Sequence, residues 1–161
     1  MLAKFSISGT DEIESMLSKL GANSVNTGKK AVREAADIVA DRVRSNLDKL
    51  PEDAFRKLSK GEEFSGVPKS QKKNLLDSMG ITPVGVTDDG TINVKVGFQG
   101  YGIYPSKKYP KGLPNQLLAR VVESGSSIRK KTPFVRPAIN QTETKAIEKM
   151  QEVITREIDK L

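Results

Sequence analysis

The stretch that organises the chain runs from Leu118 to Ala138 and reads LARVVESGSSIRKKTPFVRPA. Apolar residues at its start recur at helical spacing and predict the end of an amphipathic helix. Gly125 follows where that pattern stops, as a left-handed C-terminal cap requires. Pro133 keeps Thr132 out of helical geometry, and Pro137 suits the first turn of a following helix. The stretch therefore predicts a helix, a basic loop and a second helix.

Two side-chain roles follow from the prolines and the charges in this stretch. Phe134 and Val135 lie between the prolines, so we expect them to be non-helical and to fill a core or an interface. Glu123 is the only acid in residues 95–136, and we expect it to form a structural ion pair that fixes the turn. Its candidate partners are Arg120, Arg129 and Arg136. By themselves, these local rules describe a helix–loop–helix connection in any small globular protein.

Two motifs in the stretch resemble a family of tailed-bacteriophage proteins. Glu123-Ser124-Gly125-Ser126 is followed, after a basic loop, by Pro133-Phe134-Val135-Arg136-Pro137-Ala138. The pattern resembles the neck and tail-completion (head–tail joining) proteins of long-tailed phages. In that family a glutamate, an aromatic residue and Gly-Thr or Gly-Ser precede a Pro-Phe-Leu/Val-Arg-Pro-Ala run and a long C-terminal helix. Here Ser124 replaces the aromatic residue and Ser126 the threonine.

The resemblance is good over residues 117–161, partial over 75–98 and only architectural before that. Upstream, the family often carries Thr-Gly-x-Leu-x-x-Ser ahead of its first strand. This chain offers Leu75-Leu76-Asp77-Ser78, with Lys72 and Lys73 where Thr-Gly would fall.

The resemblance implies a virion structural protein at the head–tail junction or the upper end of the tail. It implies a homo-oligomeric ring of sixfold or twelvefold symmetry, made in the host cytoplasm, that joins the head connector to the tail. Other neck and tail proteins would be its partners, with non-specific contact to DNA in the channel. The expected scaffold and interface residues are Glu123, Gly125, Phe134, Arg136 and Pro137. The expected polar contacts to partners or DNA are Lys107, Lys108, Arg129, Lys130 and Lys131.

Composition narrows the chemistry that the chain can perform. The 161 residues include no cysteine and no histidine, which removes disulfides, thiolate metal sites and imidazole catalysis. Each acidic cluster is explained by capping, solubility or a turn, and no phosphate-binding glycine loop occurs. No signal-peptide or membrane-spanning run is present. We therefore expect a soluble intracellular protein that is not an enzyme and holds no cofactor or metal.

Charge supports a second hypothesis, a small nucleic-acid-binding module. Residues 95–136 carry nine Lys or Arg residues and one acid, so the remainder of the chain is close to neutral. Within that segment, residues 99–112 interleave three tyrosines with three lysines, a mixture that can stack on bases and contact phosphates. The same mixture is common at protein interfaces, which we favour because no nucleic-acid-binding fold is recognisable.

The remaining patterns predict an α+β fold, with long helices packed on a small antiparallel β-sheet. Ile81–Val86 and Thr91–Phe98 should form a hairpin through Asp88-Asp89-Gly90, with one face covered by the helices. We expect helices near residues 11–20, 26–49, 113–124 and 137–160, a helical turn or lead-in at Asn74–Met79, and an edge strand at Lys4–Ser8.

We expect one domain over residues 1–161, with 51–73 and 99–112 as projecting loops. Residues 51–73 are polar, with scattered aromatic residues. They form either an arm that orders against a neighbour or a mobile surface loop.

Overall fold

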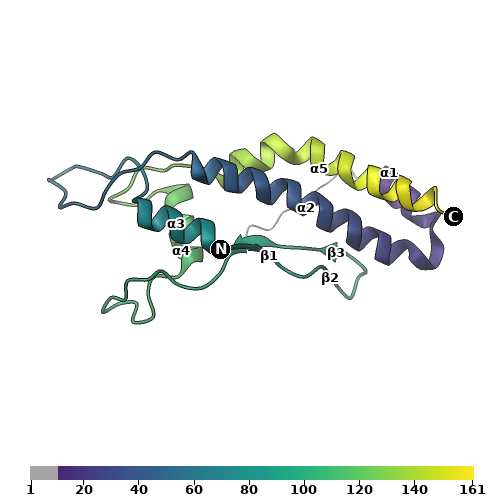
Figure 1. Ribbon diagram of the computed structural model, residues 1–161, viewed down its shortest axis with the longest axis horizontal. Helices are drawn as coiled ribbons and strands as arrows, with labels where there is room; N and C mark the ends of the chain where they lie inside the picture. Colours follow the sequence, from purple (N-terminus) through teal and green to yellow (C-terminus); the bar gives the residue numbers. More distant parts are fainter. Residues whose placement is uncertain (1–10) are drawn as a thin grey trace. The chain divides into compact units, whose positions relative to one another are not determined.

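The computed structural model describes residues 11–161, so the edge strand predicted at Lys4–Ser8 lies outside the described residues. Within that range, long helices accompany a small antiparallel sheet, which confirms the predicted α+β class (Figure 1). The elements are, in order, α1 (Asp11–Ser18), the 3-10 turn η1 (Gly21–Asn23), α2 (Ser24–Asp48), α3 (Lys69–Ser78), β1 (Met79–Ile81), β2 (Gly85–Val86), β3 (Ile92–Asn93), β4 (Val96–Phe98), α4 (Asn115–Ser124) and α5 (Val135–Ile158).

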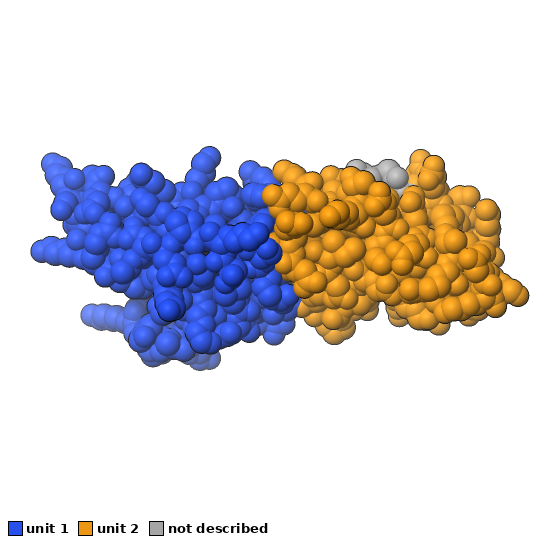
Figure 2. Space-filling view, turned by 45° about the horizontal axis from the view of Figure 1, so that its top comes forward, with its two compact units in different colours: residues 1–3, 43–80, 97–138 blue, residues 4–42, 81–96, 139–161 orange. Residues whose placement is uncertain are grey.

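The described chain divides into two compact units, each built from segments that are separate in sequence (Figure 2). Unit 1 contains residues 43–80 and 97–138, and unit 2 contains residues 11–42, 81–96 and 139–161. Helices α2 and α5 therefore contribute residues to both units. A single domain over the whole chain stays a prediction.

In unit 2, helices α1, α2 and α5 share an apolar core. Helices α2 and α5 run antiparallel, because Asn46 near the end of α2 donates to the Phe134 carbonyl just before α5, whereas Lys30 near the start of α2 pairs with Glu157 near the end of α5 at 3.3 Å. Glu34 also pairs with Arg156, at 2.9 Å. These ion pairs are partly exposed and contribute little, so the helices are held together mainly by apolar burial. The buried members of the core are Ile13, Leu20, Ala31, Val153 and Ile154.

The predicted hairpin forms, with a register shift in its middle. Near the turn, β2 pairs antiparallel with β3 and places Gly85 opposite Asn93. Farther from the turn, β1 pairs with β4, and the Thr82 N–H donates to the Lys95 carbonyl at 2.8 Å. Two residues separate Thr82 from Gly85, whereas one separates Asn93 from Lys95. The extra residue makes a bulge beside Pro83, which has no N–H to donate to a ladder.

The bulge shortens the strands relative to the predicted segments Ile81–Val86 and Thr91–Phe98. At the turn, the Asp89 carboxylate accepts hydrogen bonds from the Thr87 hydroxyl and the Thr91 N–H. These bonds, the Thr87 hydroxyl foremost, lower the pKa of Asp89 to about 2.

Helix α2 covers one face of this hairpin through a glycine. A Cβ on Gly28 would lie 2.4 Å from Cδ1 of Ile92, so the end of the Ile92 side chain packs directly against the helix at this glycine. The prediction that the long helices cover the hairpin is therefore confirmed in unit 2.

In unit 1, helices α3 and α4 pack together over an apolar core. The Phe98 ring meets the Phe134 ring edge to face, with centroids 6.0 Å apart. Two long loops extend beside α3 and α4 in Figure 1. The fully buried side chains of this unit include Leu47, Val67, Leu75, Val122 and Phe134.

Two element boundaries differ from the predicted ones. Helix α3 begins at Lys69, so the loop predicted over 51–73 ends at Pro68. The start of α3 was not predicted, because its first turn is polar and lacks the apolar periodicity on which the prediction depended. Helix α5 begins at Val135, which is helical, rather than at Pro137. Pro137 is tolerated there because N–H groups in a first turn have no intrahelical acceptor.

Candidate scaffold and interface site

Glu123, at the end of α4, caps the start of α5. Its Oε2 accepts hydrogen bonds from the N–H groups of Phe134 (2.7 Å) and Val135 (2.8 Å), and Oε1 accepts from Arg136 (3.0 Å). The carboxylate is buried and accepts from N–H groups that have no partner within the helix. Its negative charge also interacts favourably with the positive end of the helix dipole. The expected ion pair between Glu123 and an arginine is therefore wrong. Its partners are backbone N–H groups.

Gly125 ends α4 with φ +78° and ψ 177°. The positive φ was expected, but the backbone is extended rather than in the left-handed helical region. A Cβ at this position would lie 2.9 Å from Lys131 N and 3.0 Å from the Arg129 carbonyl oxygen. The turn therefore depends on glycine both for its dihedral angle and for space.

The loop that follows Gly125 folds back to complete the C-terminus of α4. The Gly125 N–H donates to the Val121 carbonyl at 2.8 Å. Both the N–H and the hydroxyl of Thr132 donate to the Val122 carbonyl, at 2.9 and 3.1 Å. These bonds supply N–H and O–H donors to carbonyl groups at the end of α4, where the helix itself runs out of N–H partners.

Phe134 fills the core of unit 1, which is one of the two positions predicted for it. Its side chain is fully buried, and the Asn46 side chain donates to its carbonyl at 3.2 Å. Of the other residues expected at the site, Pro137 is half-buried and Arg136 is exposed. Glu123, Phe134 and Arg136 therefore meet at one helix start, with only the Arg136 side chain available to a neighbour.

Arg129 was expected to contact partners or DNA, but the structure gives it partners within the chain. It is 6% exposed, and its guanidinium donates to the Gly66 carbonyl (2.7 Å) and to Oε1 of Gln71 (2.9 Å). The guanidinium also lies over the Phe64 ring, 5.8 Å from the centroid. Burial lowers its pKa, and Asp53 opposes that effect. Arg129 is therefore a scaffold residue that joins residues 126–132 to the loop 51–68.

Backbone hydrogen bonds reinforce this junction. The Phe64 N–H donates to the Ile128 carbonyl, and the Lys130 N–H donates to the Phe64 carbonyl, both at 2.9 Å. At the base of the loop, the Val67 N–H donates to the Pro51 carbonyl at 2.9 Å and joins its two ends. Residues 51–68 thus have hydrogen-bond partners within their own chain, and the two alternatives for this segment, an arm that orders against a neighbour or a mobile loop, stay predictions.

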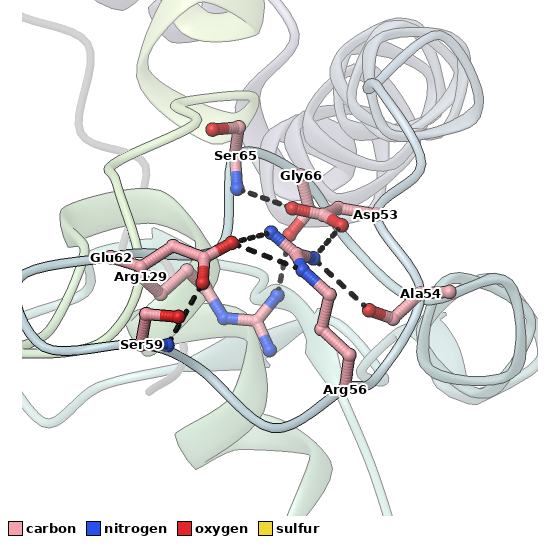
Figure 3. Close-up of polar contacts among 8 residues, drawn as sticks. All are labelled: Asp53, Ala54, Arg56, Ser59, Glu62, Ser65, Gly66 and Arg129. Atoms are coloured by element: carbon pink, nitrogen blue, oxygen red, sulfur yellow. Dashed lines mark hydrogen bonds and ion pairs between the residues drawn. The ribbon is translucent and has the colours of Figure 1, made fainter.

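A cluster of charged side chains links separate parts of this loop to one another (Figure 3). The Arg56 guanidinium bonds to the carboxylates of Asp53 and Glu62. The Ser65 N–H donates to Asp53 at 2.8 Å, and the Ser59 N–H donates to Glu62 at 2.9 Å. The Ser65 N–H, followed by Arg56, lowers the pKa of Asp53. The Ser59 N–H, followed by Arg56, likewise lowers the pKa of Glu62.

Lys72 completes the C-terminus of α2 from a neighbouring helix. Its amine is buried and donates to the carbonyls of Asp48 (3.0 Å) and Leu50 (2.8 Å) and to the Glu52 carboxylate (3.2 Å). A cation suits the negative end of a helix dipole. Lys72 is one of the residues that depart from the family's Thr-Gly pattern, and here it has a structural role that sequence reasoning missed.

The other lysines expected at the site are exposed and lie on two separate loops. Lys130 and Lys131 follow Arg129 in the loop after α4, and Lys107 and Lys108 lie in residues 99–112. We call residues 99–112 the arm. Its base is held by the Gly102 N–H, which donates to the Leu113 carbonyl at 2.8 Å, and by Asn115. Asn115 donates to the Gly100 carbonyl at 3.0 Å and, through its side chain, to Gln99 at 2.9 Å.

The arm presents apolar side chains to solvent. Tyr101 is 55% exposed, Ile103 65% and Tyr104 69%. By contrast, Tyr109 is half-buried, with the Lys108 amine 5.5 Å from its ring centroid. Three exposed apolar side chains within four residues of one loop are typical of a surface that contacts another molecule.

No metal-binding cluster of His, Cys, Asp or Glu occurs among residues 11–161, and no helix there is long and apolar enough to cross a membrane. The carboxylates of the described site accept hydrogen bonds from structural donors, as Glu123, Asp53 and Glu62 illustrate. The polar groups of this site therefore form a scaffold that holds α4, the start of α5 and the loop 51–68 together.

Residues 11–125 match the model of a family of bacteriophage tail components. This match defines the class of protein as a structural component of phage tails. The chain belongs to the family described as "Bacteriophage HK97-gp10, putative tail-component". No curated protein and no solved structure matches the chain.

The predicted kinship with phage neck and tail proteins is thereby confirmed. The matched range ends at Gly125, so the run from Pro133 to Ala138, which carries the sequence resemblance, lies beyond it. Membership of this family implies association with the virion and with other phage proteins.

Proposed function

We propose that the protein assembles as a ring at the head–tail junction or the upper end of the tail, where it joins the head connector to the tail. The observation that carries this proposal is the arm, which combines exposed Ile103 and Tyr104 with exposed lysines on an ordered base. An isolated chain leaves these apolar side chains in water, whereas a neighbouring subunit would bury them. Membership of a phage tail family supports the same role.

Within this proposal, Glu123, Gly125, Phe134 and Pro137 maintain the connection between α4 and α5. Arg136, Lys107, Lys108, Lys130 and Lys131 have exposed side chains and are the contacts to neighbours or to DNA in the channel. The proposal requires no catalytic group.

The experiment that tests the ring is the mass of the purified protein by light scattering, with negative-stain images of the same sample. Closed rings of uniform size are the expected result, either from the protein alone or after mixing with connector and tail-tube proteins of its phage. A protein that stays monomeric at high concentration, both alone and with those partners, would overturn the proposal.

A second candidate function is nucleic-acid binding by residues 95–136. It is favoured by the exposure of Tyr101 and Tyr104 beside Lys107 and Lys108, because aromatic rings and cations can together engage a strand. The burial of Arg129 removes one of the cations on which this reading depends. It predicts DNA binding that weakens steeply with salt and is lost in a Lys107→Gln/Lys108→Gln variant. DNA binding that is absent at low salt would exclude it.

A further inference from the structure

The arm carries a compact combination of apolar and positive groups. Ile103 and Tyr104 are its most exposed apolar side chains, and Lys107, Lys108 and Lys111 follow them. The arm contains no Asp or Glu, so no carboxylate within it neutralises these lysines. Because its base is closed by backbone hydrogen bonds, presenting the tip to another molecule requires little further ordering. The complementary surface should be apolar and edged with acids.

Unit 2 contains a surface of that kind. An open pocket of about 510 Å³ is lined by residues of helices α1, α2 and α5 and of the segment 89–96, which contains the hairpin turn and β3. Its walls are mainly aliphatic, with Leu17, Val32 and Ile92 among the lining residues. Two charged residues line it, Glu14 and Asp89, and both are acidic. A pocket of this size and lining can bury one or two large side chains.

We propose that the arm of one copy inserts Ile103 and Tyr104 into the pocket of a neighbouring copy. The aliphatic lining would cover the two apolar side chains. Lys107 and Lys108 would lie beside the acidic residues at the pocket edge, which complements charge across the contact. This inference rests on the proposed ring and names the contact that builds it.

The two surfaces explain why such a contact would repeat. Each copy has one arm and one pocket, which are different surfaces, so the contact is heterologous and leaves a free arm at one end and a free pocket at the other. Repetition of a heterologous contact gives a ring when the rotation closes. The alternative pairing of two arms would bring two sets of lysines together and is disfavoured by like charge.

Cysteine cross-linking can test the contact directly, because the natural chain has no cysteine. Tyr104→Cys places a thiol at the arm tip, and Thr91→Cys places one at the pocket, where Thr91 is exposed. The two singly substituted proteins are mixed and oxidised with diamide. The disulfide-linked peptides are then identified by mass spectrometry. Because the thiols start on different chains, every Tyr104→Cys to Thr91→Cys link is intermolecular.

Val25→Cys provides the matched control. Val25 is 47% exposed on α2 of the same unit and does not line the pocket. We expect at least about tenfold more linkage of Tyr104→Cys to Thr91→Cys than to Val25→Cys, because assembly raises the effective concentration of the arm at the pocket. An Ile103→Asp substitution added to the Tyr104→Cys protein should abolish the excess.

The outcomes separate the contact from the ring. Rings without preferential linkage to Thr91→Cys would overturn the arm-in-pocket contact and leave the ring intact. Monomers at every concentration, alone and with partners, together with no linkage, would overturn both. A link from Ser6→Cys to Thr91→Cys within one chain would identify the N-terminal segment as the occupant and also overturn the contact.

Discussion

The two long loops of unit 1 both combine aromatic and basic residues, but the structure buries the aromatic residue Phe64 in one and leaves Tyr104 exposed in the other. Residues 51–68 and the arm, 99–112, both carry aromatic and basic side chains and both resemble exposed connections in sequence. In the first loop, Phe64 is 4% exposed, and the guanidinium groups of Arg56 and Arg129 both lie within 6 Å of its ring centroid, at 5.3 and 5.8 Å. In the arm, Tyr104 is 69% exposed.

The difference follows from the partners available to the basic groups. The first loop contains its own acids, and Asp53 and Glu62 bond to Arg56 and to backbone N–H groups. It also lies against residues 126–130, which supply Arg129. The arm has no acid, so its cations find no counter-charge in their own segment. A mixture of aromatic and basic residues therefore does not separate a loop whose charged groups pair within it from one whose side chains stay exposed, whereas the local balance of positive and negative charge does.

The largest expected effect compares the aromatic residues of the two loops. Phe64→Ala should lower the free energy of unfolding by about 3–5 kcal/mol, because it removes a buried ring that contacts Phe55 and two arginines. Tyr104→Ala should change stability by less than about 0.5 kcal/mol, because the ring is exposed. Urea unfolding followed by circular dichroism measures both, since the chain has no tryptophan. Equal losses would refute the distinction between the loops.

A second comparison uses adjacent cations. Arg129→Met should cost about 2–4 kcal/mol, because the Gly66 carbonyl and Gln71 lose a buried charged donor. Lys130→Met, at an exposed neighbouring position, should stay within about 0.5 kcal/mol. Both variants remove one positive charge, so their difference isolates the role of burial. A Lys130→Met protein as unstable as Arg129→Met would show that charge, rather than position, holds the junction.

The third comparison concerns the start of the first loop, which Lys72 supports. Lys72→Met should cost about 1–3 kcal/mol, because three oxygen atoms at the end of α2 lose their common donor. Lys73→Met removes the same charge from an exposed position and should have little effect. Thermal unfolding of the pair tests this expectation, and matching transition temperatures would contradict it.

Much of the scaffold could be predicted because it follows local rules. The turn at Gly125, the breaks at Pro133 and the alternation that forms the hairpin each depend on residues close in sequence. The predicted element boundaries were wrong where the sequence carries no local signal for them. Helix α3 begins among polar residues, and the hairpin bulge beside Pro83 leaves the apolar alternation of Thr91–Phe98 unchanged.

The candidate site was harder to predict because its partners are distant in sequence. A charge rule pairs Glu123 with an arginine, but the folded chain places the free N–H groups of α5 at its carboxylate. Arg129 stands in a row with Lys130 and Lys131, and no local signal says that only the first turns inward. That choice depends on Phe64 and Gly66, which lie far earlier in the chain.

The smallest expected effect is a response to acid confined to the first loop. The pKa values of Asp53 and Glu62 lie below their usual 3.8 and 4.5, so the two carboxylates stabilise the folded loop fully above those usual values. This contribution is lost as the pH falls through the lowered pKa values, when Asp53 and Glu62 protonate and release Arg56 and the two serine N–H groups. Hydrogen exchange, corrected for the intrinsic effect of pH, should show falling protection at Ser59 and Ser65 while the acid-free arm changes little. An equal loss of protection in both loops would show that the charged cluster does not order residues 51–68, because the arm has no carboxylate to titrate.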